Sequence, residues 1–504
     1  MLDTLNNLGG GFAAALSLTN LFYAFLGVLV GTLVGVLPGL GPSATLSILL
    51  PLTFSLPPAA SLILFAGIYY GAKYGGSTTA ILLNIPGESA SVMTTLDGYA
   101  LAKQGRAGPA LGIAAISSFV AGTIGVIGLT FLAPVMANVA IQFGPPEFFG
   151  LMIFGLTTIV LLGGSSVLKG IISAAFGLLL ATVGSDIVSG TSRFTFGQLE
   201  LLDGIDFVLV AIGVFAIAEV LVNVQRRTTH KLFEVPRKLR ELLPTWDDIK
   251  RSRFAMAQSS VLGFGIGVLP GAGATVASFI SYGVEKRFSK RPEKFGHGAI
   301  EGVAAPEGAN NSETGGAMVP LLTLGIPGSA ATAIMLAALI IYGLQPGPQL
   351  FTEQSDLVWT IIASMYIGNV ICVLLNLPLA PLFASVLRIP YTYLYPGILV
   401  VCLIGAYSLS NSGFDLYLLV IFSVIGYAMR LLDIPAAPLL LAFVLGPLAE
   451  RALAQSMIIS GGSLSILVER PISLVFLVLA ALLLLSTVFG RGNAFRKKVL
   501  EEDE

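Results

Sequence analysis

Charged residues are scarce in this sequence. Asp, Glu, Lys and Arg make up 11% of its 504 residues, whereas 55% of the residues are hydrophobic. Soluble domains carry roughly 25% charged residues, so an ordinary soluble protein is excluded. Between Thr4 and Ala72 no Asp, Glu, Lys, Arg or His occurs. A helix of that length, at about 1.5 Å per residue, crosses a hydrocarbon core of ~30 Å more than once, which predicts an all-α polytopic membrane protein.

Cysteine and histidine are nearly absent as well. Cys372 and Cys402 both lie in apolar runs, so we interpret them as buried thiols and expect no disulfide framework. His230 and His297 fall in or near polar loops, and no Cys/His spacing typical of a metal site occurs. We therefore expect no metal and no cofactor. The net charge of −1 gives no sign of a nucleic-acid partner.

Glycine and proline, in contrast, recur in a pattern. The motif "GVLPGLG" at Gly35–Gly41 returns as "GVLPGAG" at Gly267–Gly273. Both residue types are unfavourable inside helices, so each motif predicts a break in a helix. Between Arg253 and Lys286 there is room for two half-spans, which predicts a re-entrant hairpin that turns near Pro270. Lipid cannot satisfy the backbone freed by such a turn, so protein, water or a ligand must do so.

A second pair of motifs follows in the same order. "YGGSTTAILLNIPGE" (Tyr74–Glu88) and "TGGAMVPLLTLGIPGS" (Thr314–Ser329) share a Gly-Gly, an apolar stretch and an Ile-Pro-Gly. The first pair of motifs is separated by 232 residues (Pro38 to Pro270) and the second pair by 241 residues (Pro86 to Pro327). This preserved order predicts an internal duplication.

The distribution of basic residues predicts how the two copies are oriented. Residues 225–254 contain nine Lys or Arg, so the positive-inside rule places this linker in the cytoplasm. The loop Ser55–Ala60 of the first copy is uncharged, whereas the equivalent segment Glu285–Lys294 of the second is basic. Equivalent loops on opposite sides indicate inverted-topology repeats with broken, re-entrant helical hairpins.

The predicted organisation has five parts, with boundaries taken from these charge and motif patterns. They are an N-terminal segment (1–19), a first membrane repeat (20–224), the basic cytoplasmic linker (225–254), a second membrane repeat (255–489) and a charged cytoplasmic tail (490–504).

The broken segments also predict a binding site. A helix that restarts after a turn presents free N–H groups and the positive end of its dipole, which favour an anion. The predicted substrate-binding residues are Gly39, Gly41, Ser43, Thr45, Ser77, Thr78, Asn84, Gly271, Gly273, Thr275, Asn310 and Asn311. Freed carbonyls can coordinate a cation such as Na⁺. The predicted cation-coordinating backbone residues are Pro38, Pro86, Gly87, Pro270, Pro327 and Gly328.

Two alternatives stay open at this point. The Pro-Gly motifs are also explained as kinks that serve packing, and the polar residues near them as helix-to-helix hydrogen bonds. Lys73, Glu301 and Glu307 lie beside the broken segments, where charge is functional by default. Lys73 either attracts a carboxylate, pairs with a nearby Glu, or extends to the membrane interface.

The sequence resembles the large membrane subunit of tripartite tricarboxylate transporters. The resemblance rests on the two motif pairs and on "GSDIVSGTSRFTFG" (Gly184–Gly197), "EGVAAPEGANNSETGG" (Glu301–Gly316) and "GLQPGP" (Gly343–Pro348). It implies a multi-pass permease of the bacterial inner membrane that works with a small membrane subunit and a periplasmic substrate-binding protein. It further implies alternating-access uptake of a di- or tricarboxylate such as citrate, with Na⁺ or H⁺ as the coupling ion.

An intramembrane enzyme and a passive anion channel are the competing interpretations. The "GGSTT" segment has no neighbouring base and no metal spacing occurs, so no catalytic residue is expected. Broken repeats suit alternating access better than an open pore, although the sequence does not exclude a channel.

Overall fold

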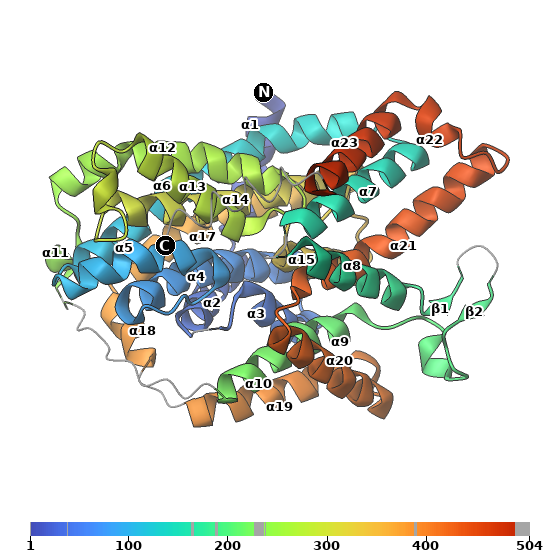
Figure 1. The fold of residues 1–504 in the computed structure, drawn as a ribbon, viewed down its shortest axis with the longest axis horizontal. Coiled ribbons are helices and arrows are strands. Elements are labelled where there is room, and N and C mark those ends of the chain that lie inside the picture. Colours follow the sequence, from blue (N-terminus) through green and yellow to red (C-terminus); the bar gives the residue numbers. More distant parts are fainter. Residues whose placement is uncertain are drawn as a thin grey trace.

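The computed structural model describes residues 2–37, 39–162, 166–186, 190–225, 236, 238–387 and 391–488. Helices dominate this part of the chain, which confirms the predicted all-α class (Figure 1). Six segments are long and apolar enough to cross a membrane, so the protein is polytopic. They are Leu18–Val36, Ala107–Ala140, Phe207–Val224, Ser355–Asn376, Gly413–Leu431 and Ala436–Ile459.

The first half of the chain contains helices that vary widely in length. They are α1 (Leu2–Ala15), α2 (Leu18–Val36), α3 (Pro42–Leu49), η1 (Pro51–Thr53), α4 (Pro58–Leu83), η2 (Ser89–Ser91), α5 (Val92–Lys103), α6 (Ala107–Ala140), α7 (Pro145–Leu162), α8 (Val167–Ala181), η3 (Leu199–Leu201), α9 (Phe207–Ala211), the π-helix η4 (Ile212–Ile217) and α10 (Ala218–Gln225). Strands β1 (Gly184–Ser185) and β2 (Ser192–Arg193) pair antiparallel, Gly184 opposite Arg193.

The second half repeats this mixture of long and short helices. They are α11 (Leu239–Leu242), α12 (Trp246–Val268), α13 (Gly273–Phe288), η5 (Pro292–Lys294), α14 (Glu301–Leu324), α15 (Ala330–Ile341), α16 (Pro348–Glu353), α17 (Ser355–Asn376), α18 (Ala380–Val386), α19 (Tyr391–Ser410), α20 (Gly413–Leu431), α21 (Ala436–Ile459), α22 (Ile466–Glu469) and α23 (Pro471–Val488).

The predicted helix breaks are present at all four motifs. Helix α2 ends at Val36 and α3 begins at Pro42, and helix α12 ends at Val268 and α13 begins at Gly273, so each Pro-Gly motif lies between two helices. Between α4 and α5, Asn84 adopts a left-handed conformation (φ 58°), and between α14 and α15 Gly325 does the same (φ 67°). A left-handed residue ends a helix by directing its backbone away from the axis. Asn84 and Gly325 are separated by 241 residues, the spacing of their motifs.

The packing of the broken helices is repeated as well. A Cβ atom on Gly35 would lie 2.1 Å from the carbonyl oxygen of Ala72, and one on Gly267 would lie 2.4 Å from that of Glu313. Only glycine permits such an approach of two helix backbones. Because α2 meets α4 as α12 meets α14, the local structure agrees with an internal duplication. The inverted orientation of the copies in the membrane stays a prediction.

The two halves exchange equivalent contacts. Helix α3 of the first half packs on α15 of the second, and α13 of the second half packs on η2 and α5 of the first. In the same way α6 packs on α14, and α17 packs on α4. This reciprocity is what a two-fold relationship between the halves requires.

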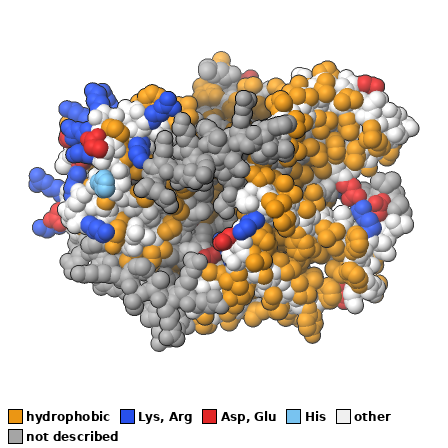
Figure 2. Space-filling model, viewed as in Figure 1, with side chains coloured by type: hydrophobic (Ala, Val, Ile, Leu, Met, Phe, Trp, Pro, Cys, Tyr) orange, Lys and Arg blue, Asp and Glu red, His pale blue; other side chains and the backbone are white. Residues whose placement is uncertain are grey.

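Basic residues gather at one end of the molecule. Figure 2 shows Lys and Arg where Figure 1 places α11 and the start of α12, whereas hydrophobic side chains cover most of the opposite end. Arg106 joins this end through an ion pair with Asp248 of 2.7 Å, so a loop of the first half contacts the linker region. Burial raises the pKa of Asp248, but the hydrogen bonds from Arg106 and Thr245 outweigh it and leave the pKa below its usual value.

Three of the four predicted part boundaries fall within helices, and the fourth (489/490) lies outside the described residues. The boundary at 19/20 lies in α2, that at 224/225 in α10 and that at 254/255 in α12. Residues 226–235 and 237 of the predicted linker (225–254) and the whole predicted tail (490–504) lie outside the described residues. The five-part division stays a prediction.

Candidate functional site

Each Pro-Gly break is held by the Ile-Pro-Gly break of the same half. Gly39 donates its backbone N–H to the carbonyl of Gly87 over 3.3 Å, and Gly271 donates to the carbonyl of Gly328 over 2.9 Å. Both donors are left-handed, with φ of 87° and 81°. The paired breaks thus satisfy part of the backbone that lipid would leave without hydrogen bonds.

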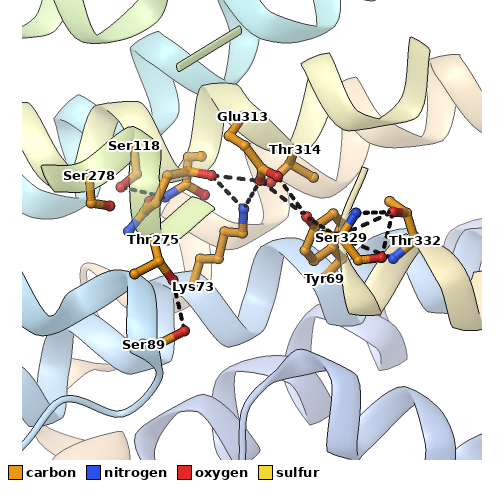
Figure 3. A network of polar contacts seen from close by, with 12 residues as sticks. Tyr69, Lys73, Ser89, Ser118, Thr275, Ser278, Glu313, Thr314, Ser329 and Thr332 are labelled. Atoms are coloured by element: carbon orange, nitrogen blue, oxygen red, sulfur yellow. Dashed lines mark hydrogen bonds and ion pairs between the residues drawn. The ribbon is translucent and has the colours of Figure 1, made fainter. Parts of the chain in front are cut away.

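Helix N-termini follow directly after the breaks. Gly41 caps α3, and α13 begins at Gly273. Ser329 caps α15 in a reciprocal capping box with Thr332. Thr275, in the first turn of α13, donates its hydroxyl to Ser89 Oγ of the first half over 2.9 Å (Figure 3). The positive ends of helices from both halves are therefore present in this region.

A buried ion pair joins the two halves beside these breaks. Lys73 Nζ on α4 lies 2.6 Å from Glu313 Oε2 on α14, and the two side chains are 1% and 0% exposed. The ammonium also donates to the carbonyl of Asn310 over 2.5 Å and lies 4.4 Å from the centre of the Tyr69 ring. Of the interpretations left open for Lys73, pairing with a nearby Glu is the one that this structure contains.

A chain of hydroxyl groups leads from this ion pair to the start of α15 (Figure 3). Tyr69 donates its hydroxyl to Glu313 Oε2 over 3.1 Å, and the hydroxyl oxygen of Tyr69 lies 3.2 Å from Ser329 Oγ. Ser329 is half-buried, whereas Lys73 and Glu313 are fully buried. The hydroxyl groups of Ser329 and Tyr69 therefore link the half-buried N-terminus of α15 with the buried charges of Glu313 and Lys73.

Several predicted substrate-binding residues lie at the breaks themselves. Ser43 and Thr275 are half-buried in the first turns of α3 and α13. Asn84 is exposed and ends α4. Gly39 and Gly271 form the left-handed turns, and Gly41 and Gly273 lie where the next helices begin. Pro38 lies outside the described residues.

Other predicted residues bond mainly within or between helices. Thr45 donates to the carbonyl of Gly41 over 3.1 Å, and Ser77 to that of Tyr74 over 2.8 Å. Asn311 donates to Ser118 over 2.9 Å and to the side-chain oxygen of Asn310 over 2.6 Å. Both asparagines and Thr78 are buried. These contacts are the hydrogen bonds within and between helices that the alternative interpretation of these residues expects. A role in ligand binding stays a prediction for them.

The predicted cation site has two of its carbonyls in use. The carbonyls of Gly87 and Gly328 accept the hydrogen bonds from the Pro-Gly turns, and a carbonyl oxygen has a second lone pair for a further contact. Pro86, Pro270 and Pro327 lie in the same breaks. Within the described ranges no group of three or more His, Cys, Asp or Glu is placed to hold a metal ion.

The sequence interpretation missed Glu313, Tyr69 and Ser329. Glu313 is a charged residue in an otherwise small and polar stretch, "NNSETGG", and α14 is fully buried along its length after Glu301. Tyr69 precedes Lys73 by one helical turn, a spacing that places both on the same face. These signals indicate buried polar residues, but no local pattern identifies their partners in the other half.

Taken together, these features define a multi-pass helical membrane protein whose two halves bring paired broken helices together. The chain belongs to the tripartite tricarboxylate transporter TctA family, which matches residues 21–441. It is thus a membrane transporter subunit, and the resemblance inferred from the motifs is confirmed.

Two relatives from Agrobacterium vitis extend this result. The chain is 46% identical over 507 residues, the full length of both chains, to an uncharacterized 52.8 kDa protein in the TAR-I ttuC' 3'region. It is 46% identical over 239 residues to an uncharacterized protein in the TAR-II ttuC' 3'region, covering 47% of this chain and 99% of that protein. No solved structure matches the chain.

Proposed function

We propose that this chain is the large permease subunit of a secondary transporter that imports a di- or tricarboxylate, such as citrate, across the bacterial inner membrane. Import is by alternating access and is coupled to Na⁺ or H⁺. The observation that carries the proposal is the pairing of breaks, Gly39 with Gly87 and Gly271 with Gly328. Broken helices paired in this way provide the half-helix ends with which transporters bind ions and anionic substrates.

The substrate's carboxylates bind between the two Pro-Gly turns. Ser43 and Thr275 lie in the first turns of α3 and α13, where free N–H groups and helix dipoles favour negative charge. Their half-buried positions support contact with a ligand that enters from water. Thr45, Ser77, Thr78, Asn84, Asn310 and Asn311 complete the predicted lining.

The coupling ion binds at the same breaks. The remaining lone pairs of the carbonyls at Gly87 and Gly328, with those of the adjacent prolines, are suited to Na⁺. The buried carboxyl groups near Lys73 are suited to H⁺, because a proton removes their charge.

The partners of the chain are a small membrane subunit and a periplasmic substrate-binding protein. Support comes from the family, whose name describes a transporter of three parts. If the assignment is right, the two membrane subunits purify together and net uptake requires the binding protein. Full uptake by this chain alone in liposomes would contradict this part of the proposal.

Counterflow tests the transport activity directly. The chain and the small membrane subunit are reconstituted in liposomes loaded with unlabelled citrate, succinate or tartrate, and the binding protein and labelled compound are added outside. A carrier accumulates the label transiently, whereas a channel only equilibrates it, and an enzyme yields a chemically altered product. Empty liposomes are the control. No transient accumulation with any compound of the panel contradicts the proposal.

A further inference from the structure

The proposed function gives the ion pair between Lys73 and Glu313 no role in binding the substrate. We propose that Lys73 is the cation that binds a carboxylate of the substrate, that Glu313 competes with this carboxylate for Lys73, and that Glu313 takes up a proton when the substrate displaces it. The inference rests on the proposed function, because it names a binding residue and the coupling ion of that same site.

The position of Lys73 carries the first step. Among the described residues it is the one Lys or Arg whose side chain is buried, and it lies where α4 of the first half meets α14 of the second. A carboxylate that leaves water for a membrane interior needs a compensating positive charge. Helix N-termini supply partial charges, whereas Lys73 supplies a full charge beside the same breaks.

Charge balance carries the second step. Lys73 and Glu313 are both buried, so either charge left without its partner is strongly destabilising. If the ammonium turns to an incoming carboxylate, Glu313 keeps only the Tyr69 hydroxyl as a donor. A proton that the buffer supplies through bulk water converts the carboxylate of Glu313 into a neutral carboxyl group. This proton balances the one substrate carboxylate that takes the place of Glu313 at Lys73.

Around Lys73 the structure describes no other buried Lys or Arg. The cations on the packed elements lie near helix ends. They are Lys103 at the end of α5, Lys286 and Arg287 at the end of α13, and Lys250, Arg251 and Arg253 near the start of α12, all exposed or half-buried. The acids, phenols and thiol on the elements around Lys73 include Tyr69, Tyr70 and Tyr74 on α4, Glu88 before η2, Asp97 and Tyr99 on α5, Glu301 and Glu307 on α14, Tyr282 and Glu285 on α13 and Asp356, Tyr366 and Cys372 on α17. Glu88 Oε1 is buried and has no hydrogen-bond partner, which adds to the excess of carboxyl groups. A substrate carboxylate therefore enters a region that already holds more acids than cations.

A route for the proton is present. Ser329 is half-buried at the N-terminus of α15, its hydroxyl contacts that of Tyr69, and Tyr69 donates to Glu313 (Figure 3). Each hydroxyl can pass on its own proton and receive another, so both hydroxyl groups end unchanged while Glu313 gains one proton. Water near Ser329 passes the proton on from the buffer, which is the net proton donor.

Binding measurements on the full-length chain with its small membrane subunit in nanodiscs test the inference. Succinate is titrated by calorimetry at about pH 7.5, well above ordinary carboxyl pKa values, in two buffers of different ionisation enthalpy, so that the difference counts protons taken up. We expect about one proton for each succinate bound by the wild type and none for Glu313→Gln. Lys73→Gln should weaken binding roughly 10- to 100-fold, the range for a charge-assisted hydrogen bond.

Matched variants separate this role from a general loss of structure. Glu301→Gln removes a carboxylate from the same helix that pairs with Arg251 instead, over 2.8 Å, and should leave affinity and proton uptake unchanged. Lys73→Arg keeps the charge and should bind more tightly than Lys73→Gln. If Lys73→Gln does not fold, the double variant Lys73→Gln/Glu313→Gln removes both charges together, and it should fold and bind weakly without proton uptake.

The outcomes distinguish the inference from the proposed function. If the wild type neither binds nor exchanges any carboxylate of the panel, the proposed function fails. If the wild type binds succinate and Lys73→Gln binds it equally well, Lys73 is not the substrate's cation. If wild-type binding takes up no proton, or Glu313→Gln still takes one up, Glu313 is not the proton acceptor.

Discussion

Gly271 donates its backbone N–H to the carbonyl oxygen of Gly328 over 2.9 Å, and this bond joins two helix breaks that are 57 residues apart in the chain. The first half contains the equivalent bond from Gly39 to Gly87. In each half, two interrupted helices are thus joined by a hydrogen bond at their breaks, where the backbone would otherwise lack hydrogen-bond partners. The break is a built element of the structure, and its residues are the first targets for mutation.

The two Pro-Gly turns should differ in their tolerance of a methyl group. A Cβ on Gly271 would lie 2.5 Å from the Cα atom of Ile159, whereas a Cβ on Gly39 would meet side-chain atoms of Glu219 and Asn223. Backbone cannot move aside as side chains can, so Gly271→Ala should be the more damaging. We expect Gly39→Ala to cost about 1–2 kcal/mol for its left-handed backbone, and Gly271→Ala a further ~1–3 kcal/mol for crowding.

Thermal unfolding of the purified variants measures this difference, and counterflow measures its effect on transport. Gly265→Ala is the control, because a Cβ there meets nothing within 4 Å and the residue lies within α12. Gly273→Ala strains a left-handed backbone without crowding, since φ at Gly273 is 66° and a Cβ atom there would meet nothing within 4 Å. Equal melting temperatures of Gly271→Ala and Gly265→Ala would show that the turn at Gly271 does not require glycine.

The hydroxyl groups at the restarted helices should contribute to substrate affinity. Ser43→Ala and Thr275→Ala each remove a donor from the first turn of a half-helix, and each should cost about 0.5–1.5 kcal/mol, or roughly 2- to 10-fold in Kd. Ser408→Ala is the control, because its hydroxyl is exposed and bonds to its own helix at Ile404. Calorimetry with citrate and with Na⁺ measures both ligands. Unchanged affinity for both would leave the Pro-Gly turns as packing devices.

The helix breaks were predictable because their signal is local. Pro and Gly within apolar runs act on the backbone wherever they occur, so Pro270 and Gly271 indicate a turn independently of any tertiary contact. The order of the motifs indicated the duplication in the same way. The Lys73–Glu313 pair was not predictable, because its members are 240 residues apart and only the packing of α4 on α14 brings them together. The same holds for Asn311, whose partner Ser118 lies on α6.

Asp248 should make the stability of the protein depend on pH in the acid range. Its folded pKa lies below the usual value, because the hydrogen bonds from Arg106 and Thr245 outweigh the effect of burial. A lowered folded pKa means that the carboxylate contributes its full stability above the unfolded pKa of about 4 and loses it as the pH falls through the folded value. At pH 7, Asp248→Asn should therefore cost roughly 1–3 kcal/mol.

Melting temperatures of the wild type and Asp248→Asn, recorded from neutral pH downward, check this prediction. The difference between the two proteins should be constant near neutrality and shrink below about pH 4. Asp247→Asn is the control, since that residue lies exposed in the same helical turn. A difference that grows as the pH falls would contradict the assigned direction of the shift.

The two halves should be inserted in the membrane with opposite orientations. Ser55 in the loop before α4 and Lys290 in the loop after α13 occupy equivalent places in the two copies, and both are exposed. Gln104 Nε2 donates to the carbonyl of His297 over 2.9 Å, so the loop that contains Lys290 lies beside the C-terminal end of α5, which is Lys103. The positive-inside rule assigns both basic loops to the cytoplasm and the uncharged loop at Ser55 to the outside.

Cysteine labelling in intact cells decides this orientation. Ser55→Cys should react with a membrane-impermeant maleimide added outside, whereas Lys290→Cys and Lys103→Cys should react only after the membrane is permeabilised. The native Cys372 and Cys402 are fully buried, so the background should be low. Lys103 and Lys290 come from different halves and from non-equivalent places in the two copies. If neither Lys103→Cys nor Lys290→Cys reacts in intact cells, both places lie on the cytoplasmic side, as inverted repeats require. Labelling of Ser55→Cys and Lys290→Cys from the same side would mean that the copies are parallel and that the reciprocal contacts of α3 and α13 have another origin.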